Sequence, residues 1–284
     1  MSPKKYATTR RRRRKSGPNP IAVILIIAAI AVVSGWCYER CTSPASANAS
    51  AQPTSTDSLM TVILPEGTPQ QIVDYPGFTV NFNKEHHQPN YVVWELTGDE
   101  TDGPVPRSNK FRPDDNVEGC ASLDDYRNSG FDRGHMAPAQ DMKWSEESMY
   151  ACFYLTNMCP QKSVLNSGSW KTLEEHTRTW ADRDSALIVI CGPVLADRLT
   201  QTIGDSKVTV PTRFFKVILA PHANPPRAIA FVMNNGKVEG GMQRAVTSVD
   251  EVERITGYDF FSALPDEIEN EIESQNRLSA WESY

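Results

Sequence analysis

An uninterrupted apolar run divides this chain into two parts of different character. Residues 21–33 are all apolar, and the uncharged stretch continues to residue 38, which gives about 18 residues, near the shortest length that spans a bilayer. A basic block at 10–15 lies before it, and positive charge stays on the cytoplasmic side of a membrane. We therefore predict a basic cytoplasmic tail at 1–20, a transmembrane signal anchor at 21–38, and a domain outside the cytoplasm, in the periplasm or the extracellular space.

The sequence leaves the processing of this segment open. Residues 45–47 (Ala-Ser-Ala) have the small side chains of a signal-peptidase site, and cleavage there gives a secreted protein, but they lie about a dozen residues beyond the apolar run. A mitochondrial inner-membrane anchor is a third interpretation, because the basic tail has few acids. The contiguous arginine block favours the uncleaved anchor. Residues 39–60, rich in Ser, Ala, Thr and Pro, are then a flexible linker, and residues 61–284 form the folded domain.

Charge is distributed unevenly along the chain. The sequence has 29 basic and 35 acidic residues, but nine of the basic residues and only one acid lie in residues 1–50. Residues 51–284 therefore carry a net charge of −14, which excludes a protein whose whole surface binds polyanions. The segment 131–180 is close to neutral, with five basic and six acidic residues. A local phosphate site stays compatible with this balance, and we expect weak, salt-sensitive binding confined to one cleft.

The folded part has the pattern of a mixed α+β domain. Short segments rich in β-branched and aromatic residues predict strands at 78–82, 91–96, 186–191, 212–219 and 228–233. Helical patterns occupy 166–178, 249–256 and 265–280, and the second has Ser248 as N-cap with Glu251 three residues later. Because no βαβ rhythm is present, we predict a mixed or antiparallel sheet core with flanking helices. No Gly-rich phosphate loop, dinucleotide fingerprint or G-x-S-x-G elbow occurs, which disfavours nucleotide-cofactor enzymes and serine hydrolases.

The cysteines permit several states. Two lie beside the apolar run and four in the folded part: Cys37, Cys41, Cys120, Cys152, Cys159 and Cys191. In an exported domain the last four can form disulfides in three alternative pairings, and buried free thiols are the other interpretation. No C-x-x-C spacing occurs, so a zinc site is disfavoured.

Residues 131–141 combine polar groups that a plain apolar core does not need. Asp132, Arg133 and His135 surround Gly134. Histidine is the usual general base near neutral pH, and arginine supplies a fixed cation for a phosphate or carboxylate. The structural alternative is a local salt bridge between Asp132 and Arg133, with His135 in the core.

A second polar stretch follows at 153–175. Asn157 ends a strand-like run, and Asn166 opens the predicted helix, with Trp170 four and Glu174 eight residues further on. A single neutral oxygen ligand at Asn166, with Glu174 acting through water, suits Mg²⁺, which keeps most of its waters. The alternatives are a helix N-cap for Asn166 and a solvated helix face for Glu174, while Trp170 is expected in the core.

Taken together, these residues resemble the DNA/RNA non-specific endonucleases, a ββα-metal, endonuclease G-like family. Three motifs in order carry the resemblance: Asp132-Arg133-Gly134-His135 with Met136-Ala137-Pro138, then Thr156-Asn157-x-x-Pro160-Gln161, then Leu165-Asn166-x-x-x-Trp170-x-x-x-Glu174. The similarity extends from about residues 60–70 to residue 262. It implies that the predicted α+β domain contains a ββα-metal active-site motif.

The resemblance also implies roles for individual residues. His135 is the expected general base that deprotonates the attacking water. Arg133 is expected to act as a catalytic group that contacts the scissile phosphate, and Arg107 is the best match for a further phosphate-binding arginine.

The remaining roles concern the metal. Asn166 is the expected sole direct protein ligand of Mg²⁺, with Mn²⁺ as an alternative cation. Glu174 is expected to contact the metal through water, and Asn157 to support the site among the catalytic residues.

The function implied by the resemblance is a Mg²⁺-dependent, sequence-non-specific endonuclease that hydrolyses DNA and RNA and leaves 5′-phosphate ends. Its expected partners are nucleic acid, the membrane through the N-terminal helix, and a second copy of the chain in a homodimer. Two alternatives stay open: a membrane-anchored nucleic-acid-binding module without catalysis, and a phosphodiesterase that acts on small diesters.

Overall fold

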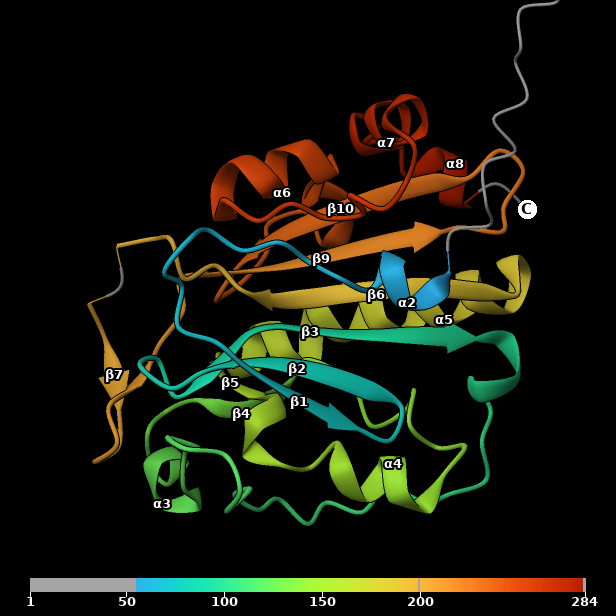
Figure 1. Cartoon of the computed structure of the whole chain (residues 1–284). Coiled ribbons are helices and arrows are strands. Elements are labelled where there is room, and N and C mark those ends of the chain that lie inside the picture. Colours follow the sequence, from blue (N-terminus) through green and yellow to red (C-terminus); the bar gives the residue numbers. More distant parts are fainter. Residues whose placement is uncertain (1–54, 199, 283–284) are drawn as a thin grey trace, which may run out of the picture. The chain divides into compact units, whose positions relative to one another are not determined.

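The strand-forming segments assemble into one large antiparallel sheet. The computed structural model describes residues 55–198 and 200–282, and its seven-stranded sheet has the order β1-β2-β3-β6-β9-β10-β11 (Figure 1). These strands are Gln71–Tyr75 (β1), Phe78–Asn83 (β2), Gln88–Thr97 (β3), Ala186–Pro193 (β6), Arg213–Ala220 (β9), Arg227–Asn234 (β10) and Val246–Thr247 (β11). The five predicted strands correspond to β2, β3, β6, β9 and β10, so the predicted α+β class with an antiparallel core is confirmed.

Both faces of the central strands are buried. Successive side chains of a strand point to opposite faces of the sheet. In β6, Leu187 and Val189 belong to one hydrophobic cluster, whereas Ile188 and Ile190 belong to a second. This explains the uninterrupted apolar sequence of β6, because a strand covered on both sides needs no polar face.

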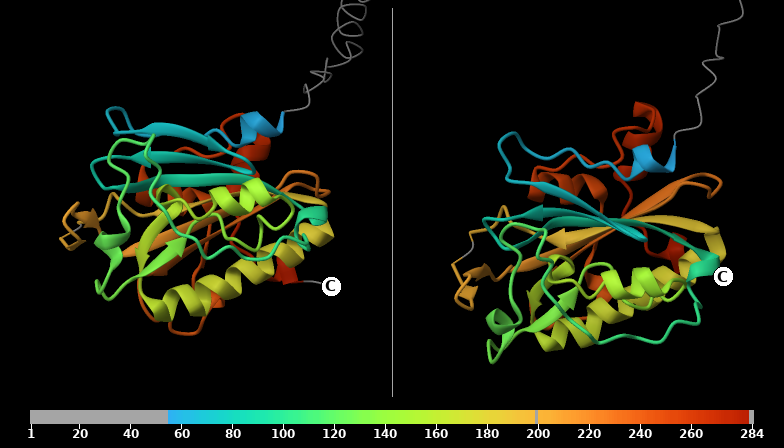
Figure 2. Two further views of the ribbon diagram at one scale, coloured as in Figure 1. Left: turned by 90° about the horizontal axis from the view of Figure 1, so that it is seen from below. Right: turned by 60° about the horizontal axis from the view of Figure 1, so that its bottom comes forward.

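Helices from different parts of the chain cover the two faces (Figure 2). The first face packs against α5 (Trp170–Asp184) through Trp170 and Trp180, and against α4 (Glu146–Ala151). The second face packs against α2 (Thr56–Leu59), α6 (Val249–Thr256) and α7 (Asp266–Glu273). Helix α2 lies inside the range that the sequence predicted as linker.

A smaller ββα unit stands beside the first face. Strands β4 (Asp132–His135) and β5 (Met158–Gln161) pair antiparallel, and a π-type turn at Leu165–Ser169 leads into α5. Gly134 is required here, because a β-carbon at this position would overlap the side chain of Gln161. The unit confirms the predicted ββα motif, although the regular helix begins at Trp170 rather than at residue 166.

The C-terminal helices follow their sequence signals in part. The Ser248 hydroxyl accepts a 3.2 Å hydrogen bond from the backbone N–H of Glu251 at the start of α6. The Glu251 carboxylate does not complete the capping box, because it pairs with Arg254. The helix predicted at 265–280 is divided into α7 and the short α8 (Ser279–Glu282).

The cysteines within the described ranges are free thiols. Cys120, Cys152, Cys159 and Cys191 form no disulfide there, and burial raises the pKa of the Cys152 and Cys191 thiols to about 12. The buried-thiol interpretation therefore holds for Cys152, Cys159 and Cys191, whereas the free thiol of Cys120 is half-buried, and Cys37 and Cys41 lie outside the described residues.

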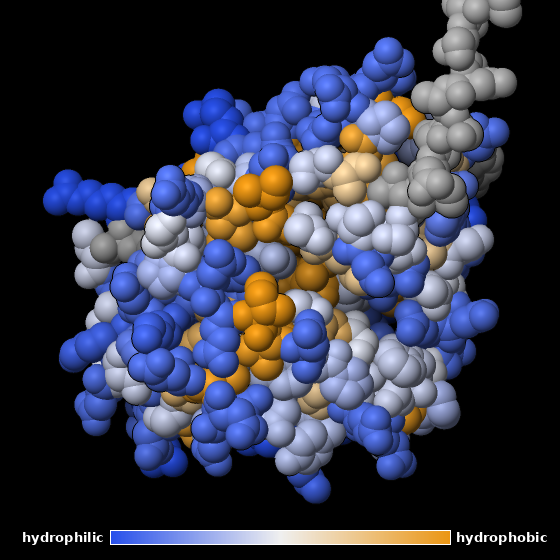
Figure 3. All heavy atoms as spheres, viewed as in Figure 1, coloured by the Kyte–Doolittle hydropathy of each residue, from blue (hydrophilic) through white to orange (hydrophobic). Residues whose placement is uncertain are grey.

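Within residues 55–198 and 200–282, no helix is long and apolar enough to cross a bilayer. The predicted anchor at 21–38 and the basic tail lie outside the described residues. The face drawn in Figure 3 is mainly hydrophilic, with some apolar side chains showing in its middle. Ile63 and Ile72 are among the large apolar residues that are more than half exposed.

Candidate active site

A cavity of about 1020 Å³ brings together residues that are far apart in the sequence. Arg107 comes from a loop, Arg133 and His135 from β4, Asn166 from the π-type turn, and Glu174 from α5. Five of the six residues predicted from the sequence therefore line one cavity.

His135 is the last residue of β4 and is only 7% exposed. Its ring packs against those of Phe111 and Phe153, with centroid distances of 5.5 and 4.9 Å. The buried Nε2 atom forms no hydrogen bond with any described residue. Burial, and then the charges of Arg107 and Arg133, lower the pKa of His135 to about 3. The imidazole is therefore neutral at pH 7, and it has a nitrogen free to accept a proton.

Two arginines flank this histidine. The guanidinium carbon of Arg133 lies 4.2 Å from the ring centroid of Phe111, and that of Arg107 lies 5.1 Å from the ring centroid of Phe153. Neither arginine forms an ion pair with a carboxylate of the described residues. Both guanidinium groups are consequently available to an anion, and arginine binds phosphate through two parallel hydrogen bonds.

Asn166 and Asp132 form a linked pair at the cavity wall. The Asn166 amide nitrogen donates a 3.0 Å hydrogen bond to Oδ2 of Asp132. The alternative salt bridge between Asp132 and Arg133 does not occur among the described residues. Because the amide nitrogen is engaged, the amide oxygen of Asn166 is the atom left to bind a cation.

Glu174 lies on α5 and is half-buried at the cavity wall. Burial raises its pKa to about 7, although the charges of Lys216 and Arg178 oppose this shift. An amide oxygen and a poorly solvated carboxylate are the hard donors that divalent cations such as Mg²⁺ and Mn²⁺ bind. Asn166 and Glu174 therefore fit the divalent cation that the sequence predicted.

Asn157 is the predicted site residue that does not line the cavity. It is fully buried, and its amide nitrogen donates 2.9 Å hydrogen bonds to the carbonyl oxygens of Ala137 and Cys152. Its amide oxygen accepts a 2.9 Å hydrogen bond from the Ala137 N–H. Asn157 thus fixes the backbone two residues after His135 and does not face the cavity.

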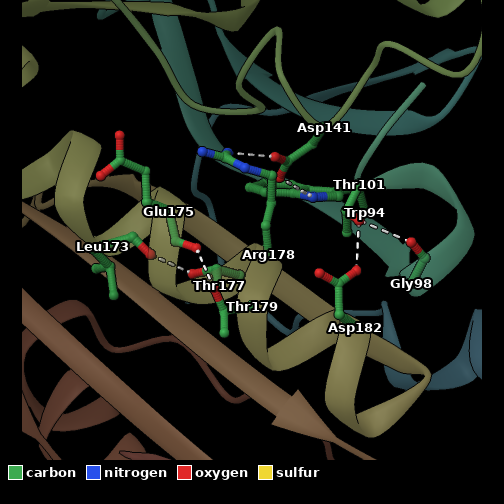
Figure 4. Close-up of polar contacts among 10 residues, drawn as sticks. All are labelled: Trp94, Gly98, Thr101, Asp141, Leu173, Glu175, Thr177, Arg178, Thr179 and Asp182. Atoms are coloured by element: carbon green, nitrogen blue, oxygen red, sulfur yellow. Dashed lines mark hydrogen bonds and ion pairs between the residues drawn. The ribbon is translucent and has the colours of Figure 1, made fainter. Parts of the chain in front are cut away.

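Sequence reasoning missed an ion pair at the cavity wall. Arg178 lies one helical turn after Glu174, and its guanidinium donates to the Asp141 carboxylate at 2.9 Å (Figure 4). Trp94 donates to the other oxygen of Asp141 at 3.2 Å. The spacing of four residues from Glu174 placed Arg178 on the same helix face and was the signal available in the sequence.

The cavity carries more positive charge than the domain as a whole. Its charged lining residues are five basic and three acidic: Arg107, Arg127, Arg133, Lys171 and Arg178, with Asp132, Glu174 and Glu175. This local excess contrasts with the net charge of −14 over residues 51–284. A polyanion is thus attracted to this cavity more than to the surrounding surface.

Two curated proteins share clear sequence similarity with the chain. It is 36% identical over 207 residues to "Nuclease EXOG, mitochondrial" of Danio rerio, covering 67% of this chain and 60% of that protein. It is 35% identical over 161 residues to "Endonuclease G, mitochondrial" of Homo sapiens, covering 52% of this chain and 54% of that protein. The chain therefore spans less than two thirds of the length of these relatives.

A solved structure has the same fold. The crystal structure of the EndoG/EndoGI complex matches with a TM-score of 0.65 and 27% sequence identity, covering 69% of this chain and 87% of that chain.

These comparisons correct the predicted location. The sequence predicted a membrane-anchored protein with its domain in the periplasm or outside the cell, or a secreted form. The relatives are named as mitochondrial nucleases, so that prediction is wrong. The physical reason is that an arginine-rich segment with few acids is common to export signals and organelle-targeting signals, so charge and hydropathy do not define the compartment.

The family comparison agrees with the geometry of the site. The sequence profile of the DNA/RNA non-specific endonucleases matches residues 55–267. This range includes both strands and the helix of the ββα unit and all the residues that line the cavity. The chain belongs to the DNA/RNA non-specific endonuclease family.

Proposed function

We propose that the chain is a Mg²⁺-dependent endonuclease that hydrolyses phosphodiester bonds of DNA and RNA without sequence preference. The observation that carries this proposal is the neutral, buried His135, which lines the cavity with Arg107 and Arg133 and whose Nε2 has no hydrogen-bond partner among the described residues. Membership of the DNA/RNA non-specific endonuclease family supports it.

The chemistry follows from the groups that line the cavity. His135 accepts the proton of the attacking water through Nε2, for which it is available because the imidazole is neutral at pH 7. Arg133 and Arg107 bind the non-bridging oxygens of the phosphate and stabilise the negative charge that develops on them. Cleavage of the bond to the 3′ oxygen leaves a 5′-phosphate end.

Asn166, through its amide oxygen, and Glu174, through water, are the residues that would hold Mg²⁺. When bound, the cation supplies positive charge to the phosphate and to the leaving oxygen. Asp132 orients Asn166 through the hydrogen bond to its amide nitrogen.

Substrate selection follows from the type of contact. Arginine contacts to phosphate carry no information about base sequence, so DNA and RNA of any sequence are expected substrates. Because the basic residues gather at the cavity, binding is expected to weaken as salt rises. The homodimer expected from the resemblance stays a prediction, which the mass of the full chain in solution tests.

The test is a cleavage assay with the full chain, supercoiled plasmid DNA and single-stranded RNA. We expect cleavage of both with Mg²⁺ and none in chelator. His135→Ala should lower the rate by about 10²–10⁴-fold, the usual contribution of a general base. His176→Ala is the matched control, because His176 lies on α5 and does not line the cavity.

The alternatives give different outcomes in the same assay. Intact plasmid after incubation with the unmutated protein and Mg²⁺, together with retention of DNA on a gel, would show a binding module without catalysis. Faster turnover of a small diester than of either polymer would show a small-substrate phosphodiesterase. Cleavage that persists in chelator would refute the metal requirement.

A further inference from the structure

Acidic side chains from two helices converge on the face of the sheet opposite to α5. One carboxylate oxygen each of Asp250, Glu253 and Glu273 lie within 4.8 Å of one another. Asp250 and Glu253 belong to α6, and Glu273 is the last residue of α7, which lies on the same side of the sheet in Figure 1. The group is therefore assembled by tertiary packing and not by one continuous sequence motif.

Glu273 is the unusual member of this group. It is only 5% exposed, and its Oε1 atom is buried without a hydrogen-bond partner in the described part of the chain. A buried carboxylate without a partner carries a large desolvation cost. Its position at the C-terminal end of α7 adds to that cost, because the free carbonyl groups there carry partial negative charge. A ligand that binds at this point would remove both costs.

The surroundings add further negative charge. Asp259 and Glu269 lie close enough to disfavour ionisation of Glu253 and Glu273. Burial, followed by the charges of Glu253, Glu269, Asp250 and Asp259, raises the pKa of Glu273 to about 9. This is the response expected of a buried carboxylate among like charges.

No cation of the described residues balances this cluster. No ion pair within the described residues involves a carboxylate of the group or of its two acidic neighbours: Asp250, Glu253, Asp259, Glu269 and Glu273. The basic residue Arg254 lies on the same helix α6 but pairs with Glu251 at 2.6 Å. The negative charge of the cluster is therefore offset either by a proton on Glu273 or by a bound cation that replaces it.

We propose that Asp250, Glu253 and Glu273 bind one Ca²⁺ ion that links α6 to α7. The three carboxylate oxygens lie no more than 4.8 Å from one another, so a single Ca²⁺ ion, which binds oxygen ligands at about 2.3–2.6 Å, can contact all three. Mg²⁺ needs shorter distances and uses one or two carboxylates with several waters. The site lies on the other side of the sheet from the cavity and is independent of the proposed nuclease activity.

The test is thermal unfolding of the full chain, first stripped of metal and then titrated with CaCl₂ in buffer without Mg²⁺. At a Ca²⁺ concentration tenfold above Kd, the expected rise in Tm is about 3–6 °C for a domain of this size. Calorimetric titration of Asn166→Ala, which lacks the predicted metal ligand of the cavity, should still give one Ca²⁺ per chain.

Matched variants locate the site. Glu273→Gln and Asp250→Asn should each abolish the rise in Tm, and Asp250 is exposed, so this variant is expected to fold even if the change at Glu273 prevents folding. Glu271→Gln removes the same charge from an exposed position of α7 and should keep the full rise.

Three results would overturn the proposal. The first is an unchanged Tm of the unmutated chain in Ca²⁺. The second is a rise that survives in Asp250→Asn. The third is a rise in Ca²⁺ that disappears in Asn166→Ala, because the ion would then occupy the cavity instead.

Discussion

Asp132 holds Asn166 through a 3.0 Å hydrogen bond that joins the first residue of β4 to the turn before α5. This bond determines which end of the amide faces the cavity. It makes Asp132 a positioning residue for the predicted metal ligand, a role that the sequence pattern did not assign to it.

Asp132→Ala is therefore expected to weaken metal binding more than it weakens catalysis. Loss of a group that orients a ligand lowers metal affinity by about 10–100-fold. Cleavage rates measured over a range of Mg²⁺ concentrations should show a higher half-saturating concentration and a nearly normal maximal rate. Asp132→Asn keeps an oxygen that accepts the hydrogen bond and is the control. Its half-saturating Mg²⁺ concentration should lie between those of the unmutated chain and Asp132→Ala. An unchanged Mg²⁺ requirement in Asp132→Ala would contradict this role.

The carboxyl group of Glu174 should make stability depend on pH when metal is absent. Its pKa is raised by burial from an ordinary value of 4.5 to about 7, so the folded chain holds a proton there that the unfolded chain has lost. The contribution of this group is favourable below pH 4.5 and is lost as pH rises through about 7. In chelator, Glu174→Gln should have a higher Tm than the unmutated chain at pH 8, and the two should converge near pH 5. Equal values at pH 8 would show that Glu174 ionises there without cost.

His135 should give the opposite dependence. Its pKa is lowered, chiefly by burial, from 6.5 to about 3, so the unfolded chain takes up a proton that the folded chain does not. The contribution of His135 is present above pH 6.5 and is lost as pH falls towards 3. His135→Gln should lose less stability than the unmutated chain between pH 7 and pH 5 in urea unfolding. His222→Gln, a change at an exposed histidine, should behave like the unmutated chain.

The Asp141–Arg178 ion pair at the cavity wall should contribute to stability. Asp141 is buried and the Arg178 side chain is only 15% exposed, so Asp141→Ala leaves a poorly solvated guanidinium without its partner. Breaking one partner of a buried pair costs about 3–5 kcal/mol. Urea unfolding measures this free energy.

An exposed pair on the same helix is the control. Glu175 pairs with Lys171 at 3.6 Å, and both side chains are more than half exposed. Glu175→Gln should change the free energy of unfolding by less than about 1 kcal/mol. A similar decrease in the free energy of unfolding in Asp141→Ala and Glu175→Gln would mean that burial does not strengthen the contribution of the Asp141–Arg178 pair.

The local sequence pattern was sufficient to predict the central strands of the sheet and the candidate site residues. The five long central strands could be predicted, because strands buried on both faces need continuous apolar, β-branched sequence. The candidate residues Arg133, His135, Asn166 and Glu174 were predicted from the resemblance to the endonuclease family, and all four line the cavity. The compartment was not determined, because charge and hydropathy do not distinguish one targeting signal from another.

Only the tertiary structure decided how the side chains are used. Asn157 and Asn166 look alike in the sequence. The side-chain amide of Asn157 is fully occupied by hydrogen bonds to the backbone of Ala137 and Cys152. The amide nitrogen of Asn166 is bonded to Asp132, which leaves its amide oxygen free. The sequence by itself determined the α+β class and the family, because these depend on residue type and spacing along the chain, and it predicted the candidate site residues. The pKa of His135 and the acidic cluster with Glu273 depended on tertiary structure, because burial and charge proximity arise only when distant segments pack together.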